Sequence, residues 1–211
     1  MMSAMFARSS RRSTATTRGD HVPRWYIAEV PNIRHAVAVK TATACLMFGT
    51  SAMYHLGTWP PKALRVLRRL DLANIALIIA GTYTPIAVAI LPRSEAVVLL
   101  WIVWVFAIGI VVSSVGGAIF NLTAPRWLYT GMYIVLGWAA VFWFPELWHY
   151  GGVVNFFLIL IGGILYTAGG VVYALKRPVL SPTTFGFHEL FHACTVAAFV
   201  CHFVVVARVA C

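Results

Sequence analysis

Residues 72–91 read LANIALIIAGTYTPIAVAIL, a stretch of twenty residues without a charged side chain. An α-helix needs about 20 apolar residues to cross a hydrocarbon core of roughly 30 Å, so this stretch predicts a membrane span. Working outward, further apolar runs predict spans at about 35–56, 96–120, 127–145, 150–175 and 186–208. The runs are continuously apolar rather than alternating, which argues against a membrane β-barrel. The predicted fold is therefore an all-α bundle of six transmembrane helices.

The composition agrees with a multi-pass membrane protein. Of the 211 residues, 61% are hydrophobic and 10% are charged, and the mean hydropathy is +0.83. Soluble domains carry about 25% charged residues. A chain with so little polar surface is not a soluble globule, a disordered protein, a disulfide scaffold or a nucleic-acid-binding domain, so nucleic acid is excluded as a partner. Lys40 lies inside the first span, and we expect its amino group to snorkel to the membrane interface.

The net charge of +10 reports the orientation of the chain. Cations gather in alternate connections between the spans: Lys62, Arg65, Arg68, Arg69, Arg126, Lys176 and Arg177. The other two connections carry only Arg93, so the positive-inside rule places the first set in the cytoplasm. Residues 1–34 are expected to form a disordered basic tail, and residues 35–211 the bundle. Six spans would place this tail outside despite its six arginines. Either the tail crosses, or a helix expected before residue 35 is missing.

Ionisable side chains at one end of the predicted spans are candidates for a metal site. His55 ends the first span and shares a helix face with Ser51, four residues before it. His188 and His192 are also four residues apart, at the start of the last span, and Asp71 begins the second. The topology places all of them at one depth near the cytoplasm. Three imidazoles with an open position for water form a catalytic Zn²⁺ site. Asp71 could then orient or deprotonate the water, and Ser51 could add a hydrogen bond.

Structural interpretations compete with this one. A single histidine in an apolar helix is often a hydrogen-bonded packing residue, and Asp71 alone could cap its helix or pair with a nearby arginine. We interpret Glu189 as an interfacial charge and His202 as a core histidine. The segment HELFH (188–192) also fits H-E-x-x-H, in which the glutamate is a general base. No acidic residue follows Glu189 in the chain, so this glutamate is interpreted as incidental to metal binding.

The chain resembles the hemolysin III family, within the superfamily of progestin and adiponectin receptors. The segments that carry the resemblance are FGTSAMYH (48–55), RRLDLANIALIIAGTYTP (68–85), FGFHELFH (185–192) and VCHF (200–203). The family fold is a bundle of seven helices with a cytoplasmic N-terminus and a zinc site near the cytoplasmic face. The resemblance implies that His55, His188 and His192 bind the zinc, that Asp71 contacts it through water and that Ser51 belongs to the same polar cluster. Nothing here resembles the first family helix, and Leu72 stands where the family usually has histidine.

Three functions follow from this resemblance. The first is zinc-dependent hydrolysis of a membrane lipid amide of the ceramide type, with a lipid as the partner and the plasma membrane of a bacterium as the location. The second is a non-enzymatic receptor-like or stress-responsive protein with structural zinc. The third is a cytolysin or pore, which ranks last because no span has the polar stripe that a wide aqueous channel needs. The sequence leaves open whether the chain is an enzyme, and it does not specify an oligomeric state.

Overall fold

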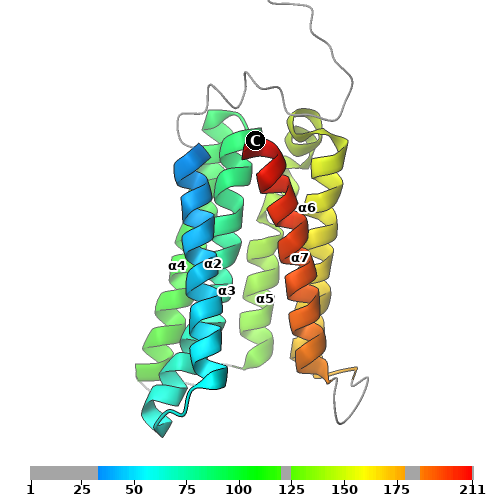
Figure 1. Cartoon of the computed structure of the whole chain (residues 1–211). Helices are drawn as coiled ribbons and strands as arrows, with labels where there is room; N and C mark the ends of the chain where they lie inside the picture. Colours follow the sequence, from blue (N-terminus) through cyan, green and yellow to red (C-terminus); the bar gives the residue numbers. More distant parts are fainter. Residues whose placement is uncertain (1–32, 120–124, 179–185, 211) are drawn as a thin grey trace, which may run out of the picture.

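The computed structural model describes residues 33–119, 125–178 and 186–210. In this part the chain is helical and contains no strand, and the helices stand side by side in one bundle (Figure 1). The predicted all-α membrane bundle is thereby confirmed. Of the predicted tail, residues 1–34, only the last two residues lie inside the described part.

Six α-helices and one short 3₁₀ helix make up the described part of the bundle. They are α2 (Ile33–Leu56), α3 (Pro61–Ile90), α4 (Arg93–Ile119), α5 (Arg126–Gly137), η1 (Ala139–Trp143), α6 (Phe144–Leu175) and α7 (Phe187–Ala210). Five stretches of it are long and apolar enough to cross a membrane, and one of these runs from Trp127 to Leu175 through α5, η1 and α6. α3 begins well before the predicted residue 72, because Pro61 occupies the first helical turn, where its missing N–H costs nothing.

The predicted boundary between the spans 127–145 and 150–175 is wrong in detail. The α-helix of the first span ends at Gly137, and residues predicted as its connection, 146–149, are helical and belong to α6. The chain departs from helical geometry at Gly152, with φ 75° and ψ 160°, a conformation that glycine adopts without strain. Beyond this kink α6 returns alongside α5: the Trp138 indole N–H donates to Thr167 Oγ1 at 2.9 Å.

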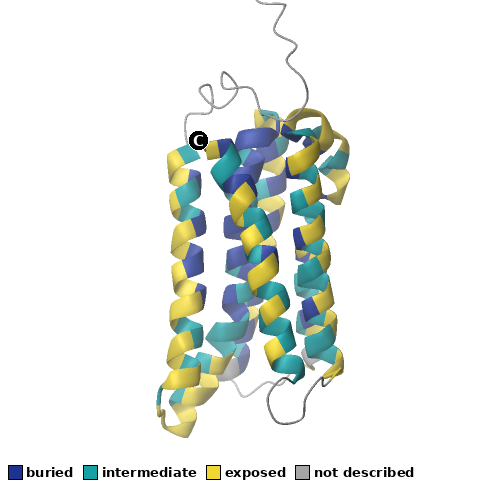
Figure 2. Ribbon diagram, turned by 45° about the vertical axis from the view of Figure 1, so that its right-hand side comes forward, coloured by how far each residue is buried: buried dark blue, intermediate teal, exposed yellow. Residues whose placement is uncertain are grey.

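α3 is the central helix of the bundle. About two thirds of its most apolar window is buried (67%), against 28% or less for the other candidate spans, and Figure 2 shows the buried residues on the inward faces of the helices. Small residues on α3 allow its neighbours to approach closely. A Cβ on Gly81, for example, would stand 3.0 Å from the Cβ of Thr43 on α2. The core is thus organised around α3, while the outer faces are apolar and face lipid.

Lys40 differs from the sequence-based expectation. Its side chain is only 4% exposed, and it does not reach an interface. The amino group instead donates to Thr82 Oγ1 on α3 at 3.1 Å and lies 4.7 Å from the ring centroid of Phe199 on α7. The prediction of a snorkelling lysine is wrong because the face of α2 that carries Lys40 packs against other helices rather than lipid.

Candidate metal centre

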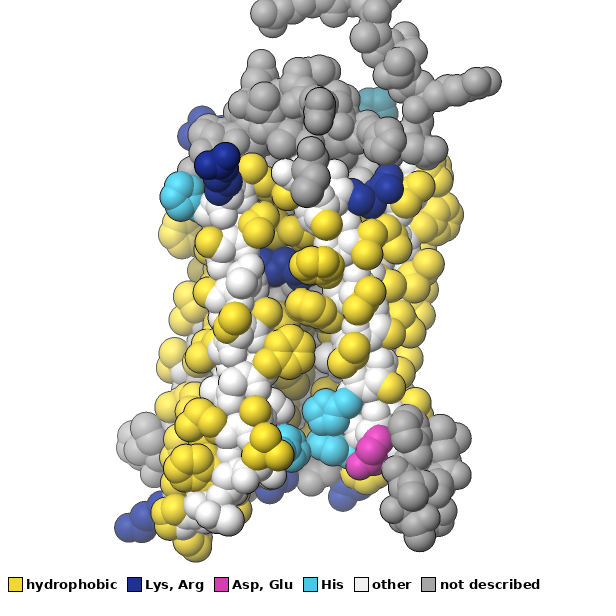
Figure 3. Space-filling view, viewed as in Figure 1, with side chains coloured by type: hydrophobic (Ala, Val, Ile, Leu, Met, Phe, Trp, Pro, Cys, Tyr) yellow, Lys and Arg dark blue, Asp and Glu magenta, His cyan; other side chains and the backbone are white. Residues whose placement is uncertain are grey.

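Three histidines converge where the end of α2 meets the start of α7. His55 occupies the last turn of α2, and His188 and His192 lie on successive turns of α7. In Figure 3 a group of histidine side chains lies at the lower end of the molecule, between the two helices. The start of α3 and the end of α6, with their lysines and arginines, lie at the same end of the bundle. The structure therefore brings together residues that are more than 130 positions apart in the sequence.

The ring nitrogens of these histidines point toward a common centre. The Nε2 atoms of His188 and His192 are 3.0 Å apart, and one nitrogen from each of the three rings lies within 4.8 Å of the others. The His55 ring centroid is 5.5 Å from that of His188 and 6.1 Å from that of His192. His55 is exposed and the other two are half-buried. Such convergence from two separate helices is not required for packing.

The donor set and its geometry fit a zinc ion. Zinc–nitrogen bonds of about 2.0–2.1 Å in a tetrahedral site imply ligand nitrogens roughly 3.3 Å apart. The separation of 3.0 Å between the two nitrogens on α7 is close to this value. The exposed His55 ring supplies the third nitrogen, within 4.8 Å of the other two. Three histidine ligands would leave the fourth position of a bound zinc open for water, as in catalytic zinc sites.

Asp71 and Ser51 lie in the wall of the same cavity. This cavity has a volume of about 290 Å³ and is also lined by the three histidines. Among the described residues, the compact group of ligand atoms contains the histidines and not Asp71. Asp71 therefore lines the cavity without belonging to the group of converging ligand atoms. One turn further along α3, the Asn74 amide donates to Thr50 Oγ1 at 2.7 Å, which holds α3 against α2 beside the site.

Sequence reasoning missed two residues of this cavity. Tyr173, on α6, lies with its ring centroid 6.5 Å from that of His188, and Arg68 lines the cavity from α3. The signal that could have identified Tyr173 is topological. The predicted span 150–175 ends on the same side as the histidines, so a tyrosine two residues before its end belongs to the same depth.

Glu189 and His202 do not belong to the site. The Glu189 carboxylate accepts a hydrogen bond from the Gly186 backbone N–H at 2.9 Å and so caps the start of α7. Because this carboxylate is hydrogen-bonded at the start of α7 and lies outside the histidine cluster, the structure disfavours Glu189 as the general base of an H-E-x-x-H site. His202 lies ten residues beyond His192 on α7, which is about 15 Å along the helix axis.

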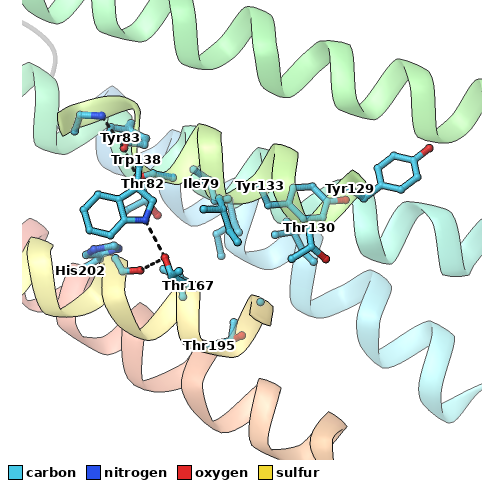
Figure 4. A pocket seen from close by; sticks show the side chains of 18 of the residues that line it. Ile79, Thr82, Tyr83, Tyr129, Thr130, Tyr133, Trp138, Thr167, Thr195 and His202 are labelled. Atoms are coloured by element: carbon cyan, nitrogen blue, oxygen red, sulfur yellow. Dashed lines mark hydrogen bonds between the residues drawn. The ribbon is translucent and has the colours of Figure 1, made fainter. Parts of the chain in front are cut away.

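A second, larger cavity adjoins the histidine cavity. It has a volume of about 580 Å³ and extends along the inside of the bundle, with lining residues on α3 from Arg65 to Ala87. Figure 4 shows Tyr129 and Thr130 toward one end and Thr82, Trp138 and His202 grouped toward the other. The walls of both cavities include Met47, Leu72, Ile75, Tyr173 and Phe191. The candidate metal centre therefore borders a largely apolar chamber in the size range of small-molecule sites, roughly 300–1,000 Å³.

The comparisons with known proteins agree on one family. A family model described as "Haemolysin-III related" matches residues 15–203. The chain is 33% identical to the Hemolysin-3 homolog of Bacillus subtilis (strain 168) over 132 residues, which is 63% of this chain and 60% of that protein. It is 34% identical to Hemolysin-3 of Bacillus cereus over 120 residues, 56% of this chain and 52% of that protein. The match thus spans between half and two thirds of the length of these relatives. No solved structure matches the chain.

Proposed function

Because the chain belongs to the haemolysin III-related family of membrane proteins, we propose that it binds zinc through His55, His188 and His192 and hydrolyses an amide bond in a membrane lipid. The observation that carries the proposal is the juxtaposition of the histidine cluster with the larger cavity. The cluster suits a hydrolytic metal, and the cavity has the apolar lining that a lipid chain needs. The shared wall residues support a site in which the bond to be cleaved lies at the border of the two cavities.

The residues around the metal have separate roles in the proposed reaction. Bound zinc supplies Lewis acidity, which lowers the pKa of water to about 7 and polarises the amide carbonyl. The Asp71 carboxylate accepts the proton of the attacking water and delivers it to the leaving amine nitrogen, so that the C–N bond breaks with a neutral amine as product. Ser51 holds the water by a hydrogen bond. Tyr173 and Arg68, at the border of the two cavities, face the polar part of the lipid.

The proposed location is the plasma membrane of a bacterium, with the metal centre on the cytoplasmic side. The relatives from Bacillus and the apolar spans support a bacterial membrane. The cations of α3 and of the end of α6 lie at the same end of the bundle as the histidines, and the positive-inside rule assigns that end to the cytoplasm.

A structural role for zinc is the second candidate. The cluster joins the last turn of α2 to the first turns of α7, two helices that otherwise make few contacts with each other. A metal held there would link α2, the first described helix, to α7, the last one, without any turnover. A pore is less well supported, because the larger cavity is lined mainly by apolar side chains rather than by the polar groups of an aqueous channel.

The zinc content of the purified full chain tests the first half of the proposal. We expect about one zinc per chain, and loss of that zinc in His55→Ala and in His192→Ala. His149→Ala is the matched control, since this exposed histidine lies on α6 outside the cluster, and it should keep the metal. Absence of zinc from the unmodified chain, grown and purified without chelators, would overturn the metal site.

Fatty-acid release from ceramide in mixed micelles tests the second half. We expect release by the zinc-loaded chain and its loss in Asp71→Asn at unchanged zinc content, because in the proposed reaction Asp71 moves a proton and does not bind the metal. Glu189→Gln should keep both zinc and turnover. Zinc without release from ceramide or from simpler N-acyl lipids would leave the structural role and reject the hydrolase.

A further inference from the structure

A group of arginines lies in the wall of the larger cavity, separate from the histidine cluster. Arg65, Arg68 and Arg69 on α3 line this cavity, and Arg68 also lines the histidine cavity. Arg68 and Arg69 follow Arg65 by three and four residues, so the Cβ atom of Arg65 is about 5–6 Å from each of theirs. The three side chains therefore belong to one stretch of the cavity wall.

These arginines mark one end of the cavity. Arg69 Nη1 donates to the Tyr129 hydroxyl at 3.4 Å, and Figure 4 shows Tyr129 at the end of the cavity opposite His202. The lining residues of α3 run from Arg65 to Ala87, which is about 33 Å along the helix axis. This length is comparable to the hydrocarbon core of a bilayer, about 30 Å. The cavity thus has one charged end and a long, largely apolar remainder that suits a hydrocarbon chain.

No acidic side chain balances the arginines within this cavity. Its described lining residues include neither aspartate nor glutamate. In the described part of the chain, Arg68 has no hydrogen bond or ion pair, although Asp71 lies one turn further along α3. Arg65 and Arg68 are exposed, so a ligand can reach their guanidinium groups. The charged end of the cavity is therefore complementary to an anion.

The positive-inside rule explains why cations occur at this end of the bundle, but it does not explain why three of them line a cavity. Lys62, Lys176 and Arg177 are exposed at the same end and line neither cavity. A general attraction to anionic lipids would involve all of these cations alike. The arginines of the cavity wall differ from the others because they adjoin a space for a hydrocarbon chain.

The kind and number of these cations favour phosphate as the anion. A guanidinium group matches the geometry of a phosphate group and donates two parallel hydrogen bonds to it. A phosphate monoester carries about −1.5 to −2 charges at neutral pH, more than a carboxylate, so it gains more from three neighbouring arginines. Basic pockets between membrane helices on the cytoplasmic side are typical sites for lipid head groups of this kind.

We propose that Arg65, Arg68 and Arg69 bind the phosphate group of a lipid whose hydrocarbon chain occupies the larger cavity. The inference rests on the proposed function in one respect, that a lipid chain occupies this cavity, and it adds the chemistry of the head group. Because Arg68 lines both cavities, a phosphate held there leaves the next few bonds of the lipid beside the histidine cavity. The preferred substrate of the proposed hydrolysis is then an N-acyl lipid with a phosphorylated head group.

Ligands with one chain and three different head groups test this inference. Radiolabelled dodecyl phosphate is bound to the purified full chain in a neutral detergent, and unlabelled dodecyl phosphate, dodecanoate and dodecanol compete with it. We expect dodecyl phosphate to bind about tenfold more tightly than dodecanoate and about 100-fold more tightly than dodecanol. Inorganic phosphate, which has no chain, should compete only weakly.

Variants separate the cavity wall from the general positive charge of this end. The dissociation constant of dodecanol is divided by that of dodecyl phosphate within each variant, so a uniform loss of folded protein does not change the ratio. The ratio should fall about tenfold in Arg65→Gln and in Arg68→Gln. It should stay unchanged in Arg177→Gln, the matched control outside both cavities. His192→Ala should also keep the ratio, because the arginines rather than a metal hold the phosphate.

A ratio near one in the unmodified chain would overturn the inference, as would a ratio that neither Arg65→Gln nor Arg68→Gln lowers. Equal binding of dodecanoate and dodecyl phosphate would reject phosphate as the anion, and equally strong competition by inorganic phosphate would reject the lipid chain. An equal fall in Arg177→Gln would show attraction by net charge alone, and a fall in His192→Ala would assign the phosphate to the metal. None of these ligands contains an amide bond, so the proposed hydrolysis can fail while the preference remains, and the reverse.

Discussion

Replacement of Gly162 by alanine probes the tightest contact between α6 and α7. A Cβ at this position would overlap Nε2 of His202 and stand 2.7 Å from its Cδ2. The ring or the backbone of α7 must therefore move, which endangers the hydrogen bond from Nε2 to the Ile159 carbonyl. Overpacking of this kind costs about 1–3 kcal/mol. The neighbouring Gly163 has no atom within 4 Å of an added Cβ, so Gly163→Ala supplies a matched control.

The two variants share the gain of about 1 kcal/mol that alanine has over glycine in a helix, so their difference isolates the clash. We expect Gly162→Ala to be less stable than Gly163→Ala by about 1–3 kcal/mol. At roughly 2–4 °C per kcal/mol for a chain of this size, thermal unfolding in detergent should separate the two midpoints by about 2–12 °C. Equal midpoints, or a lower midpoint for Gly163→Ala, would refute the close packing of α6 on His202.

Three further outcomes follow from the structure. Zinc at about 100 times its dissociation constant should raise the free energy of unfolding of the unmodified chain by roughly 2.7 kcal/mol, and it should not stabilise His192→Ala. Chemical unfolding in detergent measures both values, and an equal gain in the two proteins would contradict the site. Asn155→Ala should lower the free energy of unfolding by about 1–3 kcal/mol, because Asn155 is 2% exposed and its side-chain oxygen accepts a hydrogen bond from Arg208 Nε at 3.0 Å. An unchanged midpoint of chemical unfolding would show that this hydrogen bond contributes nothing. Glu189→Gln should keep its zinc in metal analysis, since the carboxylate caps α7 at Gly186 rather than binding metal, and a metal-free variant would reverse that assignment.

The depth of the site was predictable because helix length and loop charge place each span in the membrane. His55 at the end of one span and His188 at the start of another must lie at one level if the spans alternate in direction. The spacing of four residues then puts His188 and His192 on one face. The structure agrees, with ring nitrogens of all three histidines within 4.8 Å of one another. Asp71 likewise lies in the wall of the same cavity, as its depth predicted.

What the sequence could not predict was the direction in which each helix faces. Membrane helices are apolar on every side, so a polar face does not mark which side of the helix points away from the bundle. The hydrophobic pattern of α2 and α7 therefore does not show which faces of these two helices meet. For that reason Lys40 was expected to snorkel, whereas it is buried against Thr82 and Phe199. Tyr173 was missed for the same reason, because its part in the cavity depends on the rotation of α6.

The sequence by itself thus determined that this protein is a helical membrane bundle and that three histidines share a depth near its cation-rich end. Both follow from quantities that act along the chain: the length of apolar runs, the positions of charges and the helical repeat. Only the tertiary structure decided that the histidine cluster borders a large apolar cavity lined by His202, and that Lys40 is buried against Thr82. Those features depend on how the helices rotate about their axes and pack. Close contacts between helices, such as Gly162 against His202, determine that packing, and the sequence of one helix alone does not.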